Sequence, residues 1–326
     1  MGTLVLISIF APPSVMLLDV TALSDVFAEA NRVAGVAVYR LQVISEACTP
    51  LVTASGLRLL PDRLTRDPDE PADTLFVTGP LAVPEPPGSA LQAWFRCQAA
   101  AARRFGAVRT GVFLLAASGL LDGRRVTTHW RHADQLASRF PAVIVQPGRI
   151  FVRDGRLFTA AGAAAGMDLA LALVEDDLGA AAATTVARQL TMAVRRDGGQ
   201  AQLSVQLASQ LATRPSIQEV VAWIRADPSR DLSIAELRRR AAMSERNFAR
   251  VFRQETGMTP AEFVESTRVD TARRLLRDTG LPLKSIAVEC GFGSADALRR
   301  AFVRRQGVTP ASYRSRWSGY PSAPDH

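Results

Sequence analysis

The feature that most constrains this 326-residue chain is an internal repeat near its C-terminal end. Seven positions recur at a fixed offset of fifty residues. They are Ser244, Arg250, Phe252, Gly257, Thr259, Pro260 and Phe263, matched by Ser294, Arg300, Phe302, Gly307, Thr309, Pro310 and Tyr313. Self-similarity at one offset indicates a supersecondary unit that is used twice. Two copies are too few for a solenoid, so the range 232–317 is predicted to hold two like modules side by side.

The residues that start and end helices in the first copy predict a helix, a turn and a second helix. Ser233 and Glu236 have the spacing of a capping box, which starts the first helix. Met243 falls in the turn, Ser244 is placed as the N-cap of the second helix, and Gly257 ends that helix, because glycine adopts a left-handed C-cap at little cost.

The second copy repeats this plan after a connecting helix. Thr259-Pro260 starts the connecting helix, predicted at 261–277, with Glu262 closing its capping box. A helix at 284–290, a turn at 291–293, the N-cap Ser294 and a stop at Gly307 follow.

The second helix of each copy presents one apolar and one basic face. Phe248 and Phe252 are four residues apart and predict a core-facing side, with Arg246 and Arg250 on the opposite side. In the second copy the outward residues are Asp296, Arg299, Arg300 and Arg304, opposite Leu298 and Phe302. A single such helix is ordinarily a solvated charged face. Two copies, each with the same helix-starting and helix-ending residues, favour helices that enter the DNA major groove.

These residues resemble a known family. The stretches AMSERNFARVFRQETGMTP (242–260) and GFGSADALRRAF (291–302) are similar to the DNA-binding domain of AraC/XylS transcription regulators. The resemblance implies two modules whose recognition helices enter successive major grooves of double-stranded DNA. The residues expected to contact DNA are Arg246, Asn247, Ala249, Arg250 and Arg253, then Ala295, Asp296, Arg299 and Arg300.

The distribution of charge agrees with nucleic-acid binding. Residues 215–317 hold 19 basic and 12 acidic side chains, a surplus of +7, whereas residues 1–214 hold 20 and 18, a surplus of +2. The positive field therefore belongs to the repeated region. The cysteines Cys48, Cys97 and Cys290 have no metal-ligand spacing, so no metal and no cofactor are expected.

The N-terminal part predicts an α/β fold with a mainly parallel sheet. Apolar runs at 4–10, 39–45, 74–78 and 107–108 alternate with helical patterns at 21–33, 89–104 and from 111 onward. Alternation of this kind is typical of an α/β sandwich. A hairpin is expected at 150–153 and 157–160, followed by helices at 166–178 and 181–194. We predict domains at 1–194 and 215–317, a linker at 195–214 and a disordered tail at 318–326.

This part resembles a second family. RTGVFLLA (109–116), GLLDGRR (119–125) and TTHW (127–130) are similar to class I glutamine amidotransferase-like domains of the PfpI type, which have a flavodoxin-like fold. In enzymatic relatives a cysteine stands on a tight elbow after the strand that here ends at Val108. This chain has Arg109 there, and a guanidinium cannot attack a carbonyl. His129 and Asp19 match supporting positions of these enzymes, but supporting positions without the nucleophile do not make a hydrolase. A non-enzyme is therefore predicted.

The elbow then has two interpretations. In the first, Asp19, Gly79, Arg109, Thr110 and His129 line a site for a small effector, and Arg109 favours an anionic group such as a carboxylate. In the second, Arg109 pairs with Asp19, fills the site and leaves no room for a ligand.

Taken together, the two resemblances imply a cytoplasmic transcription regulator with a sensor domain that also dimerises. Double-stranded DNA, a small-molecule effector, a second copy and RNA polymerase are the expected partners. No stretch reaches 18 apolar residues, so no membrane partner is expected. Two alternatives remain open, an amidase or peptidase with a DNA-binding appendage and a ligand-independent regulator whose N-terminal domain only dimerises.

Overall fold

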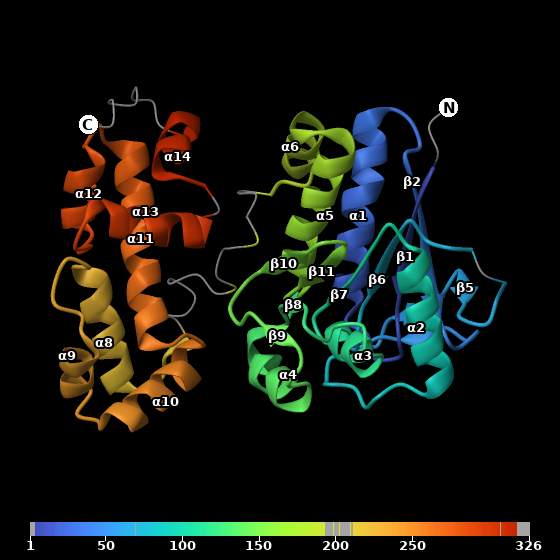
Figure 1. Cartoon of the computed structure of the whole chain (residues 1–326), viewed down its shortest axis with the longest axis horizontal. Helices are drawn as coiled ribbons and strands as arrows, with labels where there is room; N and C mark the ends of the chain where they lie inside the picture. The colour runs from blue at the N-terminus through green and yellow to red at the C-terminus, as the bar shows by residue number, and fades with distance from the viewer. Residues whose placement is uncertain are drawn as a thin grey trace. The chain divides into compact units, whose positions relative to one another are not determined.

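The computed structural model of the chain divides into two compact units, Met1–Gly198 and Gly199–His326 (Figure 1). It describes residues 4–68, 70–192, 198, 202, 209, 211–306 and 308–317. Most of the predicted linker (195–214), the whole predicted tail (318–326) and Gly307 lie outside these residues. The proposed domain boundaries therefore stay predictions.

The N-terminal unit is built on a seven-stranded sheet in the order β10-β11-β7-β6-β1-β2-β5. Its strands are β1 (Val5–Phe10), β2 (Tyr39–Ser45), β5 (Arg63–Leu64), β6 (Thr74–Val77), β7 (Arg104–Val108), β10 (Phe151–Asp154) and β11 (Leu157–Ala160). All neighbours pair in parallel except β10 and β11, which form the predicted hairpin. The prediction of a mainly parallel sheet is confirmed.

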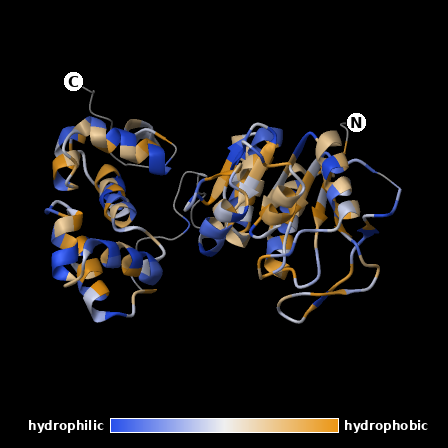
Figure 2. Ribbon diagram, turned by 60° about the horizontal axis from the view of Figure 1, so that its bottom comes forward, coloured by the Kyte–Doolittle hydropathy of each residue, from blue (hydrophilic) through white to orange (hydrophobic). Residues whose placement is uncertain are grey.

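Helices cover both faces of this sheet and bury its apolar side chains. One core lies under α1 (Leu17–Ala34), α5 (Ala163–Leu178) and α6 (Ala180–Gln189). The other lies under α2 (Ser89–Ala101), α3 (Gly111–Ala117) and α4 (Ala133–Arg139). The strands between the two layers are largely apolar (Figure 2), as expected for strands buried on both faces. The unit is thus the predicted α/β sandwich.

Several element boundaries differ from the prediction. The first helix begins at Leu17 rather than 21, and the helix expected at 166–178 begins at Ala163. The last helix of the unit ends at Gln189, whereas it was expected to reach 194, and 193–194 lie outside the described residues. Short pieces were not predicted: β3 (Leu51–Val52), β4 (Arg58–Leu59), the edge strand β5, β8 (Arg125–Val126), β9 (Ile144–Val145), the 3₁₀ turn η1 (Trp130–His132) and α4.

The prediction that the helix starting at Ser89 extends to Arg104 is wrong. The helix ends at Ala101, Ala102 is extended, and Arg104 opens β7. An arginine inside a strand is compatible with burial because its guanidinium is paired. Its Nε donates to the Thr74 hydroxyl at 2.7 Å and its Nη1 to Asp177 Oδ1 at 3.1 Å.

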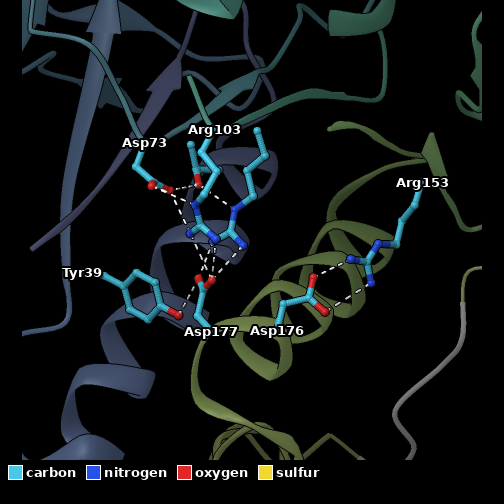
Figure 3. Close-up of polar contacts among 8 residues, drawn as sticks. Tyr39, Asp73, Arg103, Arg153, Asp176 and Asp177 are labelled. Atoms are coloured by element: carbon cyan, nitrogen blue, oxygen red, sulfur yellow. Dashed lines mark hydrogen bonds and ion pairs between the residues drawn. The ribbon is translucent and has the colours of Figure 1, made fainter. Parts of the chain in front are cut away.

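Asp177, at the end of α5, gathers charged and polar groups at the amino edge of the sheet (Figure 3). Arg103 donates to its Oδ1 at 3.0 Å, and the Tyr39 hydroxyl donates to its Oδ2 at 3.1 Å. Burial, followed by the charge of Asp177, raises the pKa of Tyr39. Arg103 also bonds Asp73 at 2.9 Å. The cluster ties α5 to strands β2, β6 and β7.

The C-terminal unit is all-α over its described elements. It contains α8 (Pro215–Ala226), α9 (Ile234–Arg240), α10 (Glu245–Thr256), α11 (Pro260–Asp278), α12 (Leu283–Glu289), α13 (Ala295–Gln306) and α14 (Pro310–Trp317). Helices α9 and α10 form the first helix-turn-helix, α12 and α13 form the second, and α11 connects them (Figure 1). The predicted two-module arrangement is confirmed.

The predicted caps are present to different degrees. Thr259 and Glu262 form a complete capping box at the start of α11. Ser233 accepts a bond from the Glu236 amide, but the Glu236 carboxylate pairs with Arg239 and Arg240 instead of closing the box. Gly257 ends α10 in the left-handed conformation, with φ of 73°.

Candidate functional site

The first candidate site is the elbow between β7 and α3, where the chain reverses within two residues. Arg109 has a φ of 57°, which is unusual for a residue with a side chain. Its amide donates to the Ala160 carbonyl at 2.9 Å, and the Thr128 hydroxyl donates to the Arg109 carbonyl at 2.7 Å. Strained backbone of this kind is characteristic of a nucleophile elbow. The turn therefore has the shape of a nucleophile elbow, with a cation in the nucleophile's place.

Gly79, which follows β6, packs directly against this elbow. A Cβ at Gly79 would lie 2.4 Å from Thr110 Oγ1 and 2.5 Å from the Gly111 amide nitrogen. Such distances are far below van der Waals contact, so only glycine permits this approach. The Thr110 hydroxyl donates to the Pro80 carbonyl. With its proton given to a carbonyl, this hydroxyl is held as a structural donor rather than as an activated nucleophile.

Arg109 and Asp19 form a two-point ion pair across the elbow. Arg109 Nε lies 2.6 Å from Asp19 Oδ2, and Nη2 lies 3.2 Å from Oδ1. The Asp19 side chain is fully buried and that of Arg109 is 13% exposed. Burial raises the pKa of Asp19, against the lowering effect of Arg109 and of the Ala163 amide. The pairing belongs to the second interpretation of the elbow, and a Cβ at Gly162 would lie 2.9 Å from Arg109 Nη2.

Two histidines stand beside this pair. The rings of His129 and His132 have centroids 5.9 Å apart, and His129 Nδ1 accepts the Arg131 amide at 3.4 Å, which caps η1. Burial and the charge of Arg109 lower the pKa of His129 to about 4. The same causes lower the pKa of His132. Both imidazoles are therefore neutral near pH 7, and the His129 ring acts as a hydrogen-bond acceptor.

The predicted effector residues are thus brought together, with one addition. Asp19 from α1, Gly79 after β6, Arg109 and Thr110 at the elbow, and His129 before η1 converge at the carboxyl ends of the central strands. His132 was missed from the sequence. Its spacing of three residues from His129, one turn of a 3₁₀ helix, was the signal that could have identified it. Among the described residues, no three His, Cys, Asp or Glu side chains gather as a metal site requires.

The second candidate site is the outer face of α10. Phe248 and Phe252 are fully buried, whereas Arg246, Asn247, Ala249, Arg250 and Arg253 are exposed, as predicted. Arg250 donates to Asn247 Oδ1 at 2.8 Å and to Gln254 Oε1 at 2.9 Å. Arg246 makes no ion pair or hydrogen bond with any residue that the structure describes. On this face Arg250 is therefore preorganised, whereas Arg246 is unengaged among the described residues.

The corresponding face of α13 is less uniform. Leu298 and Phe302 are fully buried, Asp296, Arg299 and Arg300 are exposed, and Ala295 is half-buried. Arg299 Nη1 pairs with Asp296 Oδ1 at 2.6 Å. Arg304, expected on the outward face, pairs with Glu265 of α11, which also accepts Arg305 Nε at 2.8 Å. Glu265 thus pairs two arginines of α13 with the connecting helix.

Comparison with known proteins agrees with this arrangement. A helix-turn-helix domain model matches residues 237–316, and the model of the DJ-1/PfpI family matches residues 5–176, more than half of the chain. The chain belongs to the HTH-type transcriptional regulators in which a DJ-1/PfpI domain precedes the helix-turn-helix domain, and it binds DNA.

Two relatives span most of this chain, and both come from Pseudomonas aeruginosa. The HTH-type transcriptional regulator ArgR is 33% identical over 74% of this chain and 71% of its own length. The HTH-type transcriptional regulator CdhR is 31% identical over 85% and 82%. Both family resemblances predicted from the sequence are thereby confirmed.

The N-terminal unit has further relatives of two kinds. The crystal structure of an AraC family transcriptional regulator from Pseudomonas putida has a TM-score of 0.51, 22% identity, and coverage of 57% of this chain and 99% of its own. Isonitrile hydratase of Pseudomonas putida is 36% identical over 56% of this chain and 75% of its own length. The likeness to the crystal structure shows a shared fold, and the relatives by sequence include an enzyme as well as the two regulators. No helix in the described ranges is long and apolar enough to cross a membrane.

Proposed function

We propose that α10 and α13 contact bases in successive major grooves, through the outward residues predicted from the sequence. The support is geometric. Each helix buries three apolar side chains and exposes arginines on the opposite face. Arginine reads guanine through O6 and N7, and a good bidentate contact is worth about 1–3 kcal/mol. Because Arg299 is paired with Asp296, it must leave that carboxylate to reach a base. Arg250 bonds only the neutral side chains of Asn247 and Gln254, and Arg246 has no partner among the described residues.

We further propose that the N-terminal unit is not an enzyme. The observation that carries this is Arg109 at the apex of the elbow, in the strained conformation and paired with Asp19. Its guanidinium keeps its proton and has no electron pair for attack. The Thr110 hydroxyl is committed to a carbonyl, so it supplies no substitute nucleophile.

A turnover assay tests this point. The full chain is incubated with amides, peptides, aldehydes and isonitriles, alongside Arg109→Ala and His129→Ala variants. We expect only background rates from all three proteins. Turnover above background that disappears in either variant would overturn the proposal.

The function proposed for the elbow is to sense a small metabolite that carries an anionic group. Arg109 lies at the elbow, and its charge lowers the pKa of both His129 and His132, whose rings lie 5.9 Å apart. Parallel sheets bind ligands at the carboxyl ends of their strands. An incoming carboxylate would compete with Asp19 for the guanidinium fork. Effector binding would then shift the equilibrium between DNA-competent arrangements.

The closed Arg109–Asp19 pair favours a second candidate, a ligand-independent regulator whose N-terminal unit only dimerises. Thermal-shift titration of the full chain with carboxylates, amino acids and the matching uncharged amides separates the two candidates. A sensor is stabilised by an acid but not by its amide, and Arg109→Gln reduces that shift. Absence of any shift across the panel favours the dimerising role.

We propose a second copy of the chain and RNA polymerase as further partners because of the function, not because of a particular contact. A regulator of this family would act as a homodimer through its N-terminal unit and contact RNA polymerase from the bound DNA. Because it binds DNA, we propose that it acts in the cytoplasm. Sedimentation of the full chain tests the dimer, and a sedimentation coefficient of a monomer at micromolar concentration would contradict it.

A further inference from the structure

The two helix-turn-helix modules have separate apolar cores that share one helix. The first core contains side chains of α8, α9 and α10, together with Phe263 and Val264 from the first half of α11. The second contains side chains of α12 and α13, together with Val269, Ala272 and Leu276 from the second half of α11. Each module packs by itself, so the angle between the two depends on α11 and on contacts made across its middle.

One such contact is made by Arg268, which lies on α11 between the two cores. Its Nε donates to the Pro228 carbonyl at 3.0 Å, and its Nη2 donates to the Arg230 carbonyl at 3.2 Å. Both carbonyls belong to the loop between α8 and α9. That loop has a fixed shape, because Asp227 accepts the Ser229 amide at 3.0 Å and Arg230 Nε at 3.0 Å. Arg268 therefore holds the connecting helix against a preshaped loop of the first module.

The turn of the second module rests on the same loop. A Cβ at Gly291 would lie 2.4 Å from the Pro228 carbonyl oxygen, 2.9 Å from Ser229 Cα and 3.0 Å from Arg268 Nη2. The first two neighbours are backbone atoms, which cannot rotate away as a side chain can. The φ of Gly291 is also +75°, a conformation that glycine adopts readily. The backbones of the two modules meet here, with no side chain between them at Gly291.

We infer that Arg268 and Gly291 are positioning residues that set the spacing between the two DNA half-sites this protein accepts. The inference rests on the proposal that α10 and α13 both read DNA. One base pair moves a half-site by about 3.4 Å along the duplex and about 35° around it. If the orientation of α13 relative to α10 is fixed, the protein matches one spacing between the half-sites. The second half-site is then at a high effective concentration once the first is bound. If that orientation is loosened, the protein accepts several spacings.

The test uses the full chain and a duplex that it selects from a random 30-bp DNA library. Binding is then measured on derivatives with one base pair inserted or removed between the half-sites. The wild-type protein is expected to bind both derivatives about tenfold or more weakly, the loss expected when base contacts of one helix are broken. In Gly291→Ala and Arg268→Gln this discrimination is expected to fall below about threefold, or the preferred spacing to shift. The base preference within each half-site stays unchanged.

Gly293→Ala is the matched control, because it lies in the same turn and a Cβ there meets nothing within 4 Å. It should keep the wild-type spacing profile. Arg268→Gln adds no Cβ and no backbone strain, so it carries the test if Gly291→Ala does not fold. Variants that unfold at a lower temperature yet keep the wild-type profile overturn the inference, as does a wild-type protein indifferent to spacing. Selection of a single half-site overturns instead the proposal that both helices read DNA.

Discussion

At the scale of single residues, buried charge decides which side chains matter for stability. Asp177 is only 9% exposed and bonds Arg103, Arg104 and Tyr39, and the Arg104 side chain is 5% exposed. Its neighbour Asp176 makes a simple pair with Arg153, and both side chains of that pair are 39% or more exposed (Figure 3). Two adjacent carboxylates on one helix thus have very different environments.

We therefore expect Asp177→Asn to destabilise the N-terminal unit by about 3 kcal/mol, because it leaves the Arg104 guanidinium buried without its charge partner. Asp176→Asn is the matched control and should cost less than about 1 kcal/mol, since water screens an exposed pair. Urea unfolding of the full chain, followed through the N-terminal transition, gives both values. Equal losses for the two variants would contradict the assignment of Asp177 as the anchoring carboxylate.

The lowered pKa of His129 predicts a pH dependence of stability. Folding reduces this pKa from the ordinary 6.5 to about 4, so between these pH values the unfolded chain binds a proton that the folded chain does not. The unfolding free energy should therefore fall as the pH decreases from about 6.5 to about 4, by at most about 1.4 kcal/mol per pH unit, and His129 should contribute no slope above that window.

His129→Gln should remove this share of the slope. Thermal unfolding of wild type and variant at several pH values measures it, and the difference between the two curves isolates His129 from carboxyl groups that titrate in both proteins. Parallel curves across the whole window would show that His129 is not the group responsible.

At the scale of elements, α10 and α13 occupy equivalent places in the repeat but carry different surfaces. Arg250 is held by Asn247 and Gln254 within α10, whereas Arg299 is held by an acidic partner within α13. Arg300 makes no ion pair or hydrogen bond with the residues that the structure describes. The two helices are thus expected to differ in how readily their arginines reach bases.

We expect Arg250→Ala to relax base preference within one half-site only, and Arg300→Ala within the other, each at a cost of about 1–3 kcal/mol for the preferred base. Arg277→Ala is the control, since it removes the same charge from the end of α11, outside both recognition helices. Footprinting and a base-substitution series on the selected duplex measure the effect. Uniform weakening at every base position would identify the substituted arginine as a phosphate contact instead.

At the scale of the whole molecule, the charge surplus separates the roles of the two units. Residues 215–317 carry a surplus of +7 against +2 for residues 1–214. Phosphate contacts made by arginine release counterions from DNA, which makes binding depend on salt. The C-terminal unit is therefore expected to supply the affinity.

For the full chain, the logarithm of the binding constant should fall linearly with the logarithm of salt concentration, with a slope of about −0.9 for each phosphate contacted. Fluorescence anisotropy of the labelled duplex between about 50 and 200 mM salt measures the slope. A chain restricted to residues 199–326 should retain it, and one restricted to residues 1–198 should not bind. A flat profile, or binding by the N-terminal unit alone, would place the interface elsewhere.

Features that are encoded by local periodicity and by the residues at helix ends could be predicted from the sequence. The fifty-residue repeat predicted two modules, the glycines and threonines at its helix ends placed the turns, and apolar runs such as the one ending at Phe10 predicted buried strands. The presence of Arg109 at the nucleophile position could also be predicted, because that assignment needs only one residue and the motif that resembles the PfpI type. Each of these signals lies within a short stretch of chain, where backbone geometry alone fixes which residues share a face.

Only the tertiary structure decided which partner each charged side chain has. Arg109 pairs with Asp19, ninety residues away, which was the second interpretation of the elbow, after that of a ligand-facing arginine. Arg304 keeps 53% of its side chain exposed and pairs with Glu265 of α11, and Gly291 meets the loop at Pro228. These choices depend on which distant surfaces come within about 4 Å after the cores have packed. A periodic pattern in the sequence does not specify these partners, because a long polar side chain on a given helix face can reach several different ones.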